Sequence, residues 1–303
     1  MNYAIETNDL SKKYGDVLAV THVNLQVKQG EIFGFLGLNG AGKTTTIRML
    51  LGMIRPSEGN VRVLGQALGA GGCGPWAQVG HLVESPSAYP ELTVRENLDI
   101  ARRLQGMKNP KAVDDVMQKL SIASYSKRKA GTLSMGNLQR LGLARAMIHN
   151  PTLLILDEPS NGLDPAGVVE IRELLTDLAR SHGVTVFMSS HILTEVERLA
   201  TRIGIIHKGQ IIEDLDTVKL ERFRARRLEI KVRDFAKAHA CLIRENYSAT
   251  INDGVILVSD LRAIEAPDEI ARLLVNTDTP PTHLTVVQQN LEEHFMQLTG
   301  SAK

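Results

Sequence analysis

One eight-residue motif constrains this chain more than any other feature. Residues 37–44 read GLNGAGKT and fit the pattern G-x-x-x-x-G-K-[ST], between a predicted strand (31–37) and a predicted helix (44–53). Gly40 and Gly42 let backbone amides converge on phosphate oxygens where a Cβ atom would obstruct them. The N-terminus of the following helix adds a partial positive charge. The motif therefore predicts a binding site for a nucleoside triphosphate.

The loop residues have distinct expected roles. Lys43 is expected to bridge the β- and γ-phosphates, and the Thr44 hydroxyl is expected to ligate Mg²⁺. The remaining positions expected to contact the nucleotide are Gly37, Leu38, Asn39, Gly40, Ala41, Gly42 and Thr45.

A second motif supplies two acidic residues. In LLILDEP (153–159) an apolar strand delivers Asp157 to its C-terminal edge, where the carboxylate can hold the Mg²⁺ shell. Glu158 follows and points elsewhere, towards the γ-phosphate and an attacking water. The alternative for Glu158 is an acid at a helix N-terminus, which the helix dipole favours.

Residues 1–220 alternate short apolar strands with amphipathic helices. Strands are predicted at 152–158 and 184–190, a helix at 168–180, and a strand pair within 202–212. This alternation predicts an α/β fold with a mostly parallel sheet covered by helices. The segment from about 92 to 148 holds several successive helices and is expected to form a helical insertion.

Residues 221–303 are expected to form a second, small α+β domain. A basic linker (222–227) is expected to enter a strand, followed by a helix, a hairpin turning at 252–254, a second helix, a strand and a closing helix. The order β-α-β-β-α-β is typical of a ferredoxin-like module. We expect this domain to stabilise a dimer or to be simply structural.

Composition limits the classes of partner. There are 35 basic and 34 acidic residues, so the net charge of +1 does not favour nucleic acid or an anionic membrane as a partner.

Cys73 and Cys241 are far apart and are expected to be free thiols. The glycine run at 69–75 is expected to be a loop without a phosphate-binding role. The N-terminal segment does not resemble a signal peptide, and no apolar run approaches 18 residues, so we expect any role at a membrane to depend on a partner.

Five motifs together resemble the ATP-binding subunit of an ABC transporter. They are GLNGAGKT, LSMGN, LLILDEP, SNGLD and SSHILTE, in the family's order and spacing over residues 3–218. The segment ESPSAYPELTVRENL (84–98) and the ending LEEHFMQLTG (291–300) are similar to the bacterial drug- and peptide-export branch, which includes bacitracin-resistance and lantibiotic-immunity subunits. The resemblance implies the P-loop NTPase fold of the ABC ATPase type, with ATP and Mg²⁺ as ligands.

The resemblance also implies a site shared between two chains. In the family, two ATPase domains pair head-to-tail, so Ser134 and the Gly136 amide would contact the γ-phosphate bound to the partner's Lys43. The loop that crosses this dimer interface corresponds to Asn161, Gly162, Leu163 and Asp164.

Two further side chains take roles from the same resemblance. Tyr14 lies where family members stack an aromatic ring on adenine, although an ordinary strand-edge tyrosine is the alternative. His191 occupies the switch-histidine position, where it would hydrogen-bond the γ-phosphate and hold Glu158 and the water in line. A structural histidine is the alternative there.

Two positions depart from the wider family. Glu84 stands where most members have a glutamine that links the Mg²⁺ and water shell to the surface contacting the membrane subunit, so we expect metal and coupling roles for it. In LSMGN, Met135 and Asn137 replace a glycine and a glutamine, and an inactive half-site is the alternative. Gln139 follows two positions later, where its side chain is expected to be within reach as a substitute.

The expected function is that of an ATP-hydrolysing motor. The chain would work as a homodimer, without nucleic acid, and power a separate multi-span permease that exports a drug, peptide antibiotic or lipid-like molecule. It would lie at the cytoplasmic side of a bacterial cell membrane through that permease. The alternative is a soluble ABC-type ATPase, or an ATP-gated regulatory subunit without transport.

Overall fold

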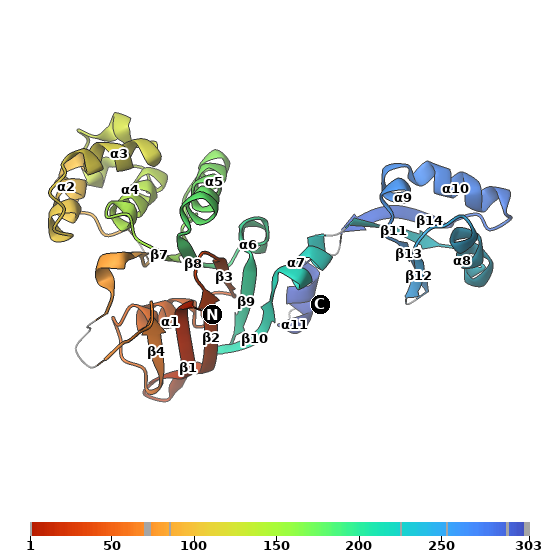
Figure 1. Cartoon of the computed structure of the whole chain (residues 1–303), viewed down its shortest axis with the longest axis horizontal. Coiled ribbons are helices and arrows are strands. Elements are labelled where there is room, and N and C mark those ends of the chain that lie inside the picture. Colours follow the sequence, from red (N-terminus) through yellow and green to blue (C-terminus); the bar gives the residue numbers. More distant parts are fainter. Residues whose placement is uncertain are drawn as a thin grey trace. The chain divides into compact units, whose positions relative to one another are not determined.

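The computed structural model describes residues 2–69, 74–84, 86–224, 226–252, 254–288 and 291–299. The chain forms two compact units, Met1–Asp216 and Thr217–Lys303, drawn in Figure 1. Cys73, most of the glycine run 69–75 and Asp253 of the expected hairpin turn lie outside the described residues, whereas Cys241 is a buried free thiol. Among the described residues, no helix is both long and apolar enough to span a membrane.

A six-stranded sheet is the centre of the first unit. Its strand order is β10-β9-β3-β8-β7-β6, with all neighbours parallel except β9 and β10. Every residue of β3, β7 and β8 is buried, as expected for parallel strands covered on both faces. The strands are β3 (Ile32–Leu36), β6 (Val79–Leu82), β7 (Leu153–Asp157), β8 (Thr185–Ser190), β9 (Arg202–His207) and β10 (Gln210–Leu215).

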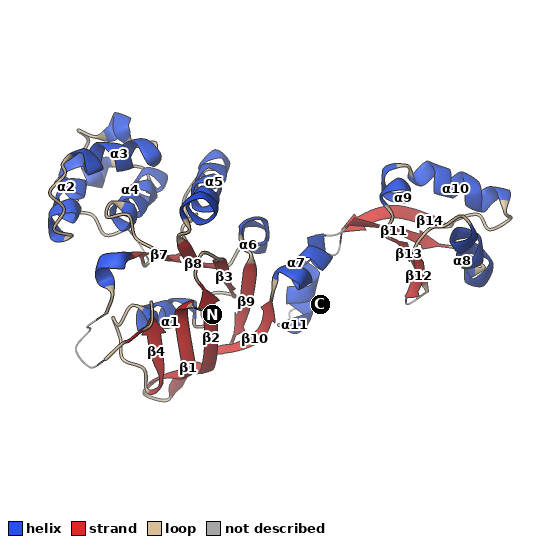
Figure 2. Cartoon of the chain, viewed as in Figure 1, coloured by secondary structure: helices blue, strands red, loops and turns tan. Residues whose placement is uncertain are grey.

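A second, antiparallel sheet was not predicted from the sequence. Its order is β2-β1-β4-β5, and it consists of β1 (Tyr3–Tyr14), β2 (Val17–Lys28), β4 (Glu58–Val63) and β5 (Gln66–Ala67). Helix α1 (Lys43–Leu50) packs with both sheets, because Ile47 shares one buried cluster with Val23 of β2 and Ile155 of β7. Figure 2 shows this helix among the strands. The phosphate-binding loop is therefore anchored by two sheets.

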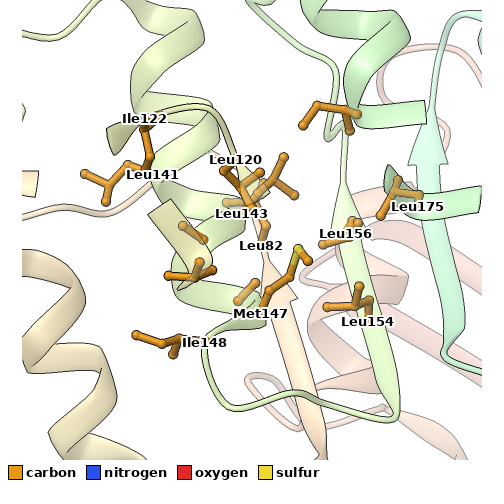
Figure 3. Packing of buried hydrophobic residues seen from close by; sticks show 14 of the residues in the cluster. Leu82, Leu120, Ile122, Leu141, Leu143, Met147, Ile148, Leu154, Leu156 and Leu175 are labelled. Atoms are coloured by element: carbon orange, nitrogen blue, oxygen red, sulfur yellow. The ribbon is translucent and has the colours of Figure 1, made fainter. Parts of the chain in front are cut away.

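Helices cover the other face of the six-stranded sheet. Leu143 and Met147 of α4 pack against Leu82 of β6 and Leu154 of β7 in a large buried cluster (Figure 3). The expected helical insertion is present as α2, α3 and α4. The helices are α2 (Val94–Leu104), α3 (Lys111–Lys119), α4 (Met135–Met147), α5 (Pro165–His182) and α6 (Leu193–Leu199), with short 3-10 turns at Trp76–Gln78, Ala123–Tyr125 and Ala130–Thr132.

The second unit has a four-stranded antiparallel sheet in the order β12-β13-β11-β14. This is the strand arrangement of the ferredoxin-like order expected from the sequence. Residues 222–224 of the expected linker are instead the end of helix α7, residues 226 and 227 begin β11, and an extra short helix, α9, precedes α10. The elements are α7 (Thr217–Arg224), β11 (Arg226–Lys231), α8 (Phe235–Arg244), β12 (Ala249–Asn252), β13 (Val255–Val258), α9 (Leu261–Glu265), α10 (Pro267–Asn276), β14 (His283–Gln288) and α11 (Leu291–Leu298).

Candidate functional site

The loop between β3 and α1 has the backbone that the glycine pattern predicts. Gly42 has φ 107°, and a Cβ atom there would lie 2.7 Å from the Ala19 carbonyl oxygen, so only glycine fits. Gly42 also precedes α1 without offering a side-chain cap to its first turn. The first N–H groups of α1 therefore remain available to an anionic ligand.

Lys43 begins α1, and its ammonium group lies at the mouth of this loop. The side chain is only 6 % exposed, and Nζ donates hydrogen bonds to the carbonyl oxygens of Gly37 (2.7 Å) and Leu38 (3.3 Å). Nζ also lies 3.4 Å from Oε1 of Glu158. A buried cation satisfied by loop carbonyls and one carboxylate is well placed to exchange them for phosphate oxygens.

Asp157 ends β7 and is almost completely buried. Its two carboxylate oxygens have different donors, because Thr44 Oγ1 donates to Oδ2 at 2.7 Å and Ser189 Oγ donates to Oδ1. Within the described ranges, no group of three His, Cys, Asp or Glu side chains forms a metal cage. Magnesium commonly uses one or two carboxylates together with substrate phosphates, so a hydroxyl beside one buried carboxylate fits this ion.

Glu158 adopts a left-handed backbone conformation, with φ 51°. Its N–H donates to Ser189, at 3.0 Å from Oγ and 3.3 Å from the carbonyl oxygen, and this fixes the residue. The side chain is 22 % exposed, and its Oε2 lies 2.6 Å from Nδ1 of His191. The carboxylate therefore contacts an imidazole on one oxygen and the Lys43 ammonium on the other.

Gln139 has a different position from the one expected. Its side chain is 3 % exposed, and Nε2 donates to the carbonyl oxygens of Glu158 (3.1 Å) and Pro159 (3.0 Å). The amide donor is thus engaged with the backbone that carries Glu158. Gln139 supports this backbone and does not replace the missing signature glutamine, which corrects the expectation from the sequence.

A hollow of about 630 Å³ brings most of the predicted nucleotide site together. Gly37, Leu38, Ala41 and Tyr14 are not part of its lining. Tyr14 is 45 % exposed at the end of β1, with the Lys12 ammonium 5.0 Å from its ring centroid. The predicted residues that line the hollow are Asn39, Gly40, Gly42, Lys43, Thr44, Thr45, Glu84, Asp157, Glu158, Asn161 and His191.

Ser134 and Gly136 line a different hollow, of about 650 Å³, together with Gly162, Leu163 and Asp164. Ser134 caps α4, because its Oγ accepts from the Asn137 N–H at 3.4 Å. The signature turn therefore lies beside the expected interface loop, and Met135, between Ser134 and Gly136, lines both this hollow and the Lys43 hollow.

Asp164 has a clear local role within this second hollow. Its Oδ1 accepts from the Gly167 N–H at 3.0 Å and caps the N-terminus of α5. A local capping role therefore accompanies the interface role expected for this residue.

Glu84 follows β6 and has a left-handed backbone, with φ 57°. Its Oε1 lies 2.5 Å from a guanidinium nitrogen of Arg48 on α1. The sequence reasoning missed Arg48, Ser189 and the backbone role of Gln139. Ser189 had a signal, since it is the penultimate residue of the predicted strand 184–190 and precedes the Ser190–His191 pair.

Comparisons with known proteins show what the chain is similar to. The family model described as "ABC transporter" matches residues 20–161. The chain is 40 % identical over 304 residues to the bacitracin transport ATP-binding protein BcrA of Bacillus licheniformis, covering 99 % of this chain and 98 % of that protein. It is 35 % identical over 213 residues to the lantibiotic transport ATP-binding protein SrtF of Streptococcus pyogenes, covering 69 % of this chain and 89 % of the relative.

A solved ATP-binding subunit of an ABC transporter is similar in structure. It has a TM-score of 0.65 and 28 % sequence identity, and the match covers 73 % of this chain and 92 % of the other.

Proposed function

The chain belongs to the ATP-binding subunits of ABC transporters, and we propose that it powers the export of a peptide antibiotic through a separate membrane permease. Because the chain is a member of this family, it binds and hydrolyses ATP. The substrate class is suggested by two relatives, one described as a bacitracin transport protein and one as a lantibiotic transport protein. The protein would then act at the cytoplasmic face of a bacterial membrane, held there by the permease.

The convergence of Lys43, Glu158 and His191 is the observation that supports the catalytic part of this proposal. Lys43 would exchange its loop carbonyls for the β- and γ-phosphates. Glu158, within reach of the same ammonium, would accept the proton of the attacking water. His191 would orient that carboxylate from its other side, at 2.6 Å.

Thr44 and Asp157 would hold Mg²⁺. Mg²⁺ would offset the negative charge of the phosphates. Ser189 would keep the buried carboxylate of Asp157 in place through its hydroxyl. Tyr14 is proposed to stack on the adenine ring, with its exposed face available for that contact.

Two copies of the chain are proposed to complete each site. Within one chain, neither Ser134 nor Gly136 lines the hollow of Lys43, although Met135 between them lines both hollows. A second copy, paired head-to-tail, would bring its Ser134 hydroxyl and Gly136 amide onto the γ-phosphate. The Asn161–Asp164 loop would then lie at the interface between the copies.

The proposal is tested with tagged Glu158→Gln protein, purified with ATP from detergent-solubilised membranes. This variant is expected to bind ATP without turning it over and to co-purify stoichiometrically with a multi-span membrane protein. Lys43→Ala, which should not bind ATP productively, is the matched control. Export of bacitracin-type peptides by the reconstituted complex is then measured. If the Glu158→Gln protein were instead recovered in the soluble fraction, with ribosomes, with nucleic acid or without a partner, the proposed transport function would be contradicted. The assignment of ATPase activity would still stand.

A further inference from the structure

We propose that Arg48 is a positioning residue that neutralises Glu84 where Glu84 lines the phosphate pocket. The two residues come from segments that the sequence does not connect: Arg48 lies in α1 and Glu84 in the loop after β6. Their side chains meet at 2.5 Å. The inference rests on the nucleotide site proposed above and concerns the regulation of that site.

The position of Glu84 makes its charge consequential. It lines the 630 Å³ hollow together with Lys43, Thr44 and Asp157. It also lines a second hollow of about 410 Å³, which includes His81 and residues of α2 and α4. Among the described residues, Glu84 is the one member common to both linings. An unneutralised carboxylate here would repel the phosphates of a bound nucleotide.

The backbone of Glu84 indicates that its orientation is imposed. A φ of 57° is uncommon for a residue other than glycine and persists where surrounding contacts determine it. The Arg48 guanidinium donates a hydrogen bond to this side chain. The pair is partly exposed, with side-chain exposures of 36 % and 57 %, so its main effect is on where the charge lies and only weakly on stability.

Arg48 also connects the pair to the phosphate loop. It lies on the same helix as Lys43 and Thr44, whose first turn faces the proposed phosphates. Glu84 belongs to the loop after β6, and both side chains of the pair line the second hollow. The ion pair is therefore a direct contact between the helix that would receive the nucleotide and the loop that faces the second hollow.

The test measures the dissociation constant of ATP by equilibrium dialysis in EDTA at low ionic strength. Without Mg²⁺, any metal role of Glu84 does not enter the measurement. Arg48→Met leaves one uncompensated negative charge and is expected to weaken binding about fivefold. Arg48→Met combined with Glu84→Gln has no charge at either position and is expected to bind within about twofold of the unchanged chain, a non-additivity that marks direct coupling.

Two controls separate this effect from damage to the fold. Arg48→Lys keeps the charge and is expected to bind within about twofold of the unchanged chain. Arg272→Met removes an arginine whose carboxylate partner, Asp268, lies at 3.1 Å in the second unit, and it should leave ATP binding unaltered. The loss of ATP affinity in Arg48→Met should be smaller at high salt, because salt screens partly exposed charges. A loss of affinity caused by a packing defect would persist at high salt.

Two results would overturn the inference. One is ATP binding by Arg48→Met as tight as that of the unchanged chain. The other is weak binding that persists when Glu84→Gln is added. Failure of the unchanged chain to bind ATP is a different result, which would remove the proposed nucleotide site and this inference together.

Discussion

Ser189 is the residue on which both acids of the site depend. Its hydroxyl donates to Asp157 and accepts from the Glu158 N–H, and its side chain is completely buried. Ser189→Ala removes one donor from a buried carboxylate and loosens the left-handed backbone of Glu158. We expect a stability loss of about 1–3 kcal/mol. We also expect kcat to fall about tenfold with a smaller change in KM, since positioning of the base affects the chemical step most.

Denaturant titration and steady-state ATPase kinetics measure these two effects. Ser181→Ala is a matched control, because its hydroxyl also donates to a carboxylate, Asp177, but on the exposed surface of α5. This control should keep both its stability and its kcat. Normal turnover in Ser189→Ala would show that the hydroxyl does not position Glu158.

The same residues show how far the site could be predicted from the sequence. Lys43, Thr44 and the Asp157–Glu158 pair were predicted because a contiguous motif specifies them together with the strand that presents each one. Ser189 and Arg48 contact residues from distant segments of the chain. Such contacts cannot be predicted from patterns in a single sequence. Glu84 was noticed as a departure from the family, but its guanidinium partner depends on how α1 packs beside β6.

At the scale of elements, the hydrophobic pattern of the sequence predicted strands best where every residue of the strand is buried. The runs that form β7 and β8 are buried throughout and were predicted within a residue or two. The hairpin β1–β2 was missed because its register shifts repeatedly, with left-handed residues at Asp9 and His22 interrupting the alternation that predicts a half-buried strand. The last three residues of helix α7 were taken for part of a linker because the run 222–227 is basic.

Helix α2 offers a test of a local start signal that the sequence does contain. Thr93 and Glu96 form a capping box at its N-terminus, where the Thr93 hydroxyl accepts from the Glu96 N–H and the Glu96 carboxylate accepts from the Thr93 N–H. The backbone hydrogen bond from Thr93, followed by the one from its hydroxyl, lowers the pKa of Glu96. The stabilisation from this ionised carboxylate is therefore present above the unfolded pKa and is lost as pH falls through the folded pKa.

Thr93→Ala should weaken this arrangement in a pH-dependent way. Loss of the N-cap is expected to cost about 1 kcal/mol at neutral pH. The pKa of Glu96 should rise towards its ordinary value because the hydroxyl donor is gone, and the stability should then change less between neutral and acidic pH. Side-chain carboxyl NMR titration and denaturation at several pH values measure both effects. An unchanged Glu96 pKa would contradict the capping assignment.

At the scale of the whole molecule, two hollows in one chain pose a question of stoichiometry. If Lys43 and Ser134 contact the same ATP only when they belong to two different copies, each dimer has two sites. Each site then consists of the Lys43 loop of one copy and the Ser134 turn of the other. Lys43→Ala and Ser134→Ala should then be inactive separately. Mixed together, they form dimers in which one site contains both defects and the other contains neither, so activity should return to at most about a quarter of normal. ATPase assays of the separate and mixed variants measure this recovery. A Lys43→Ala, Ser134→Ala double variant mixed with Lys43→Ala is the control, because none of its dimers has an intact Lys43 loop. If the two single variants still formed dimers when mixed but stayed inactive, the Lys43 loop and the Ser134 turn would not form one site across the interface.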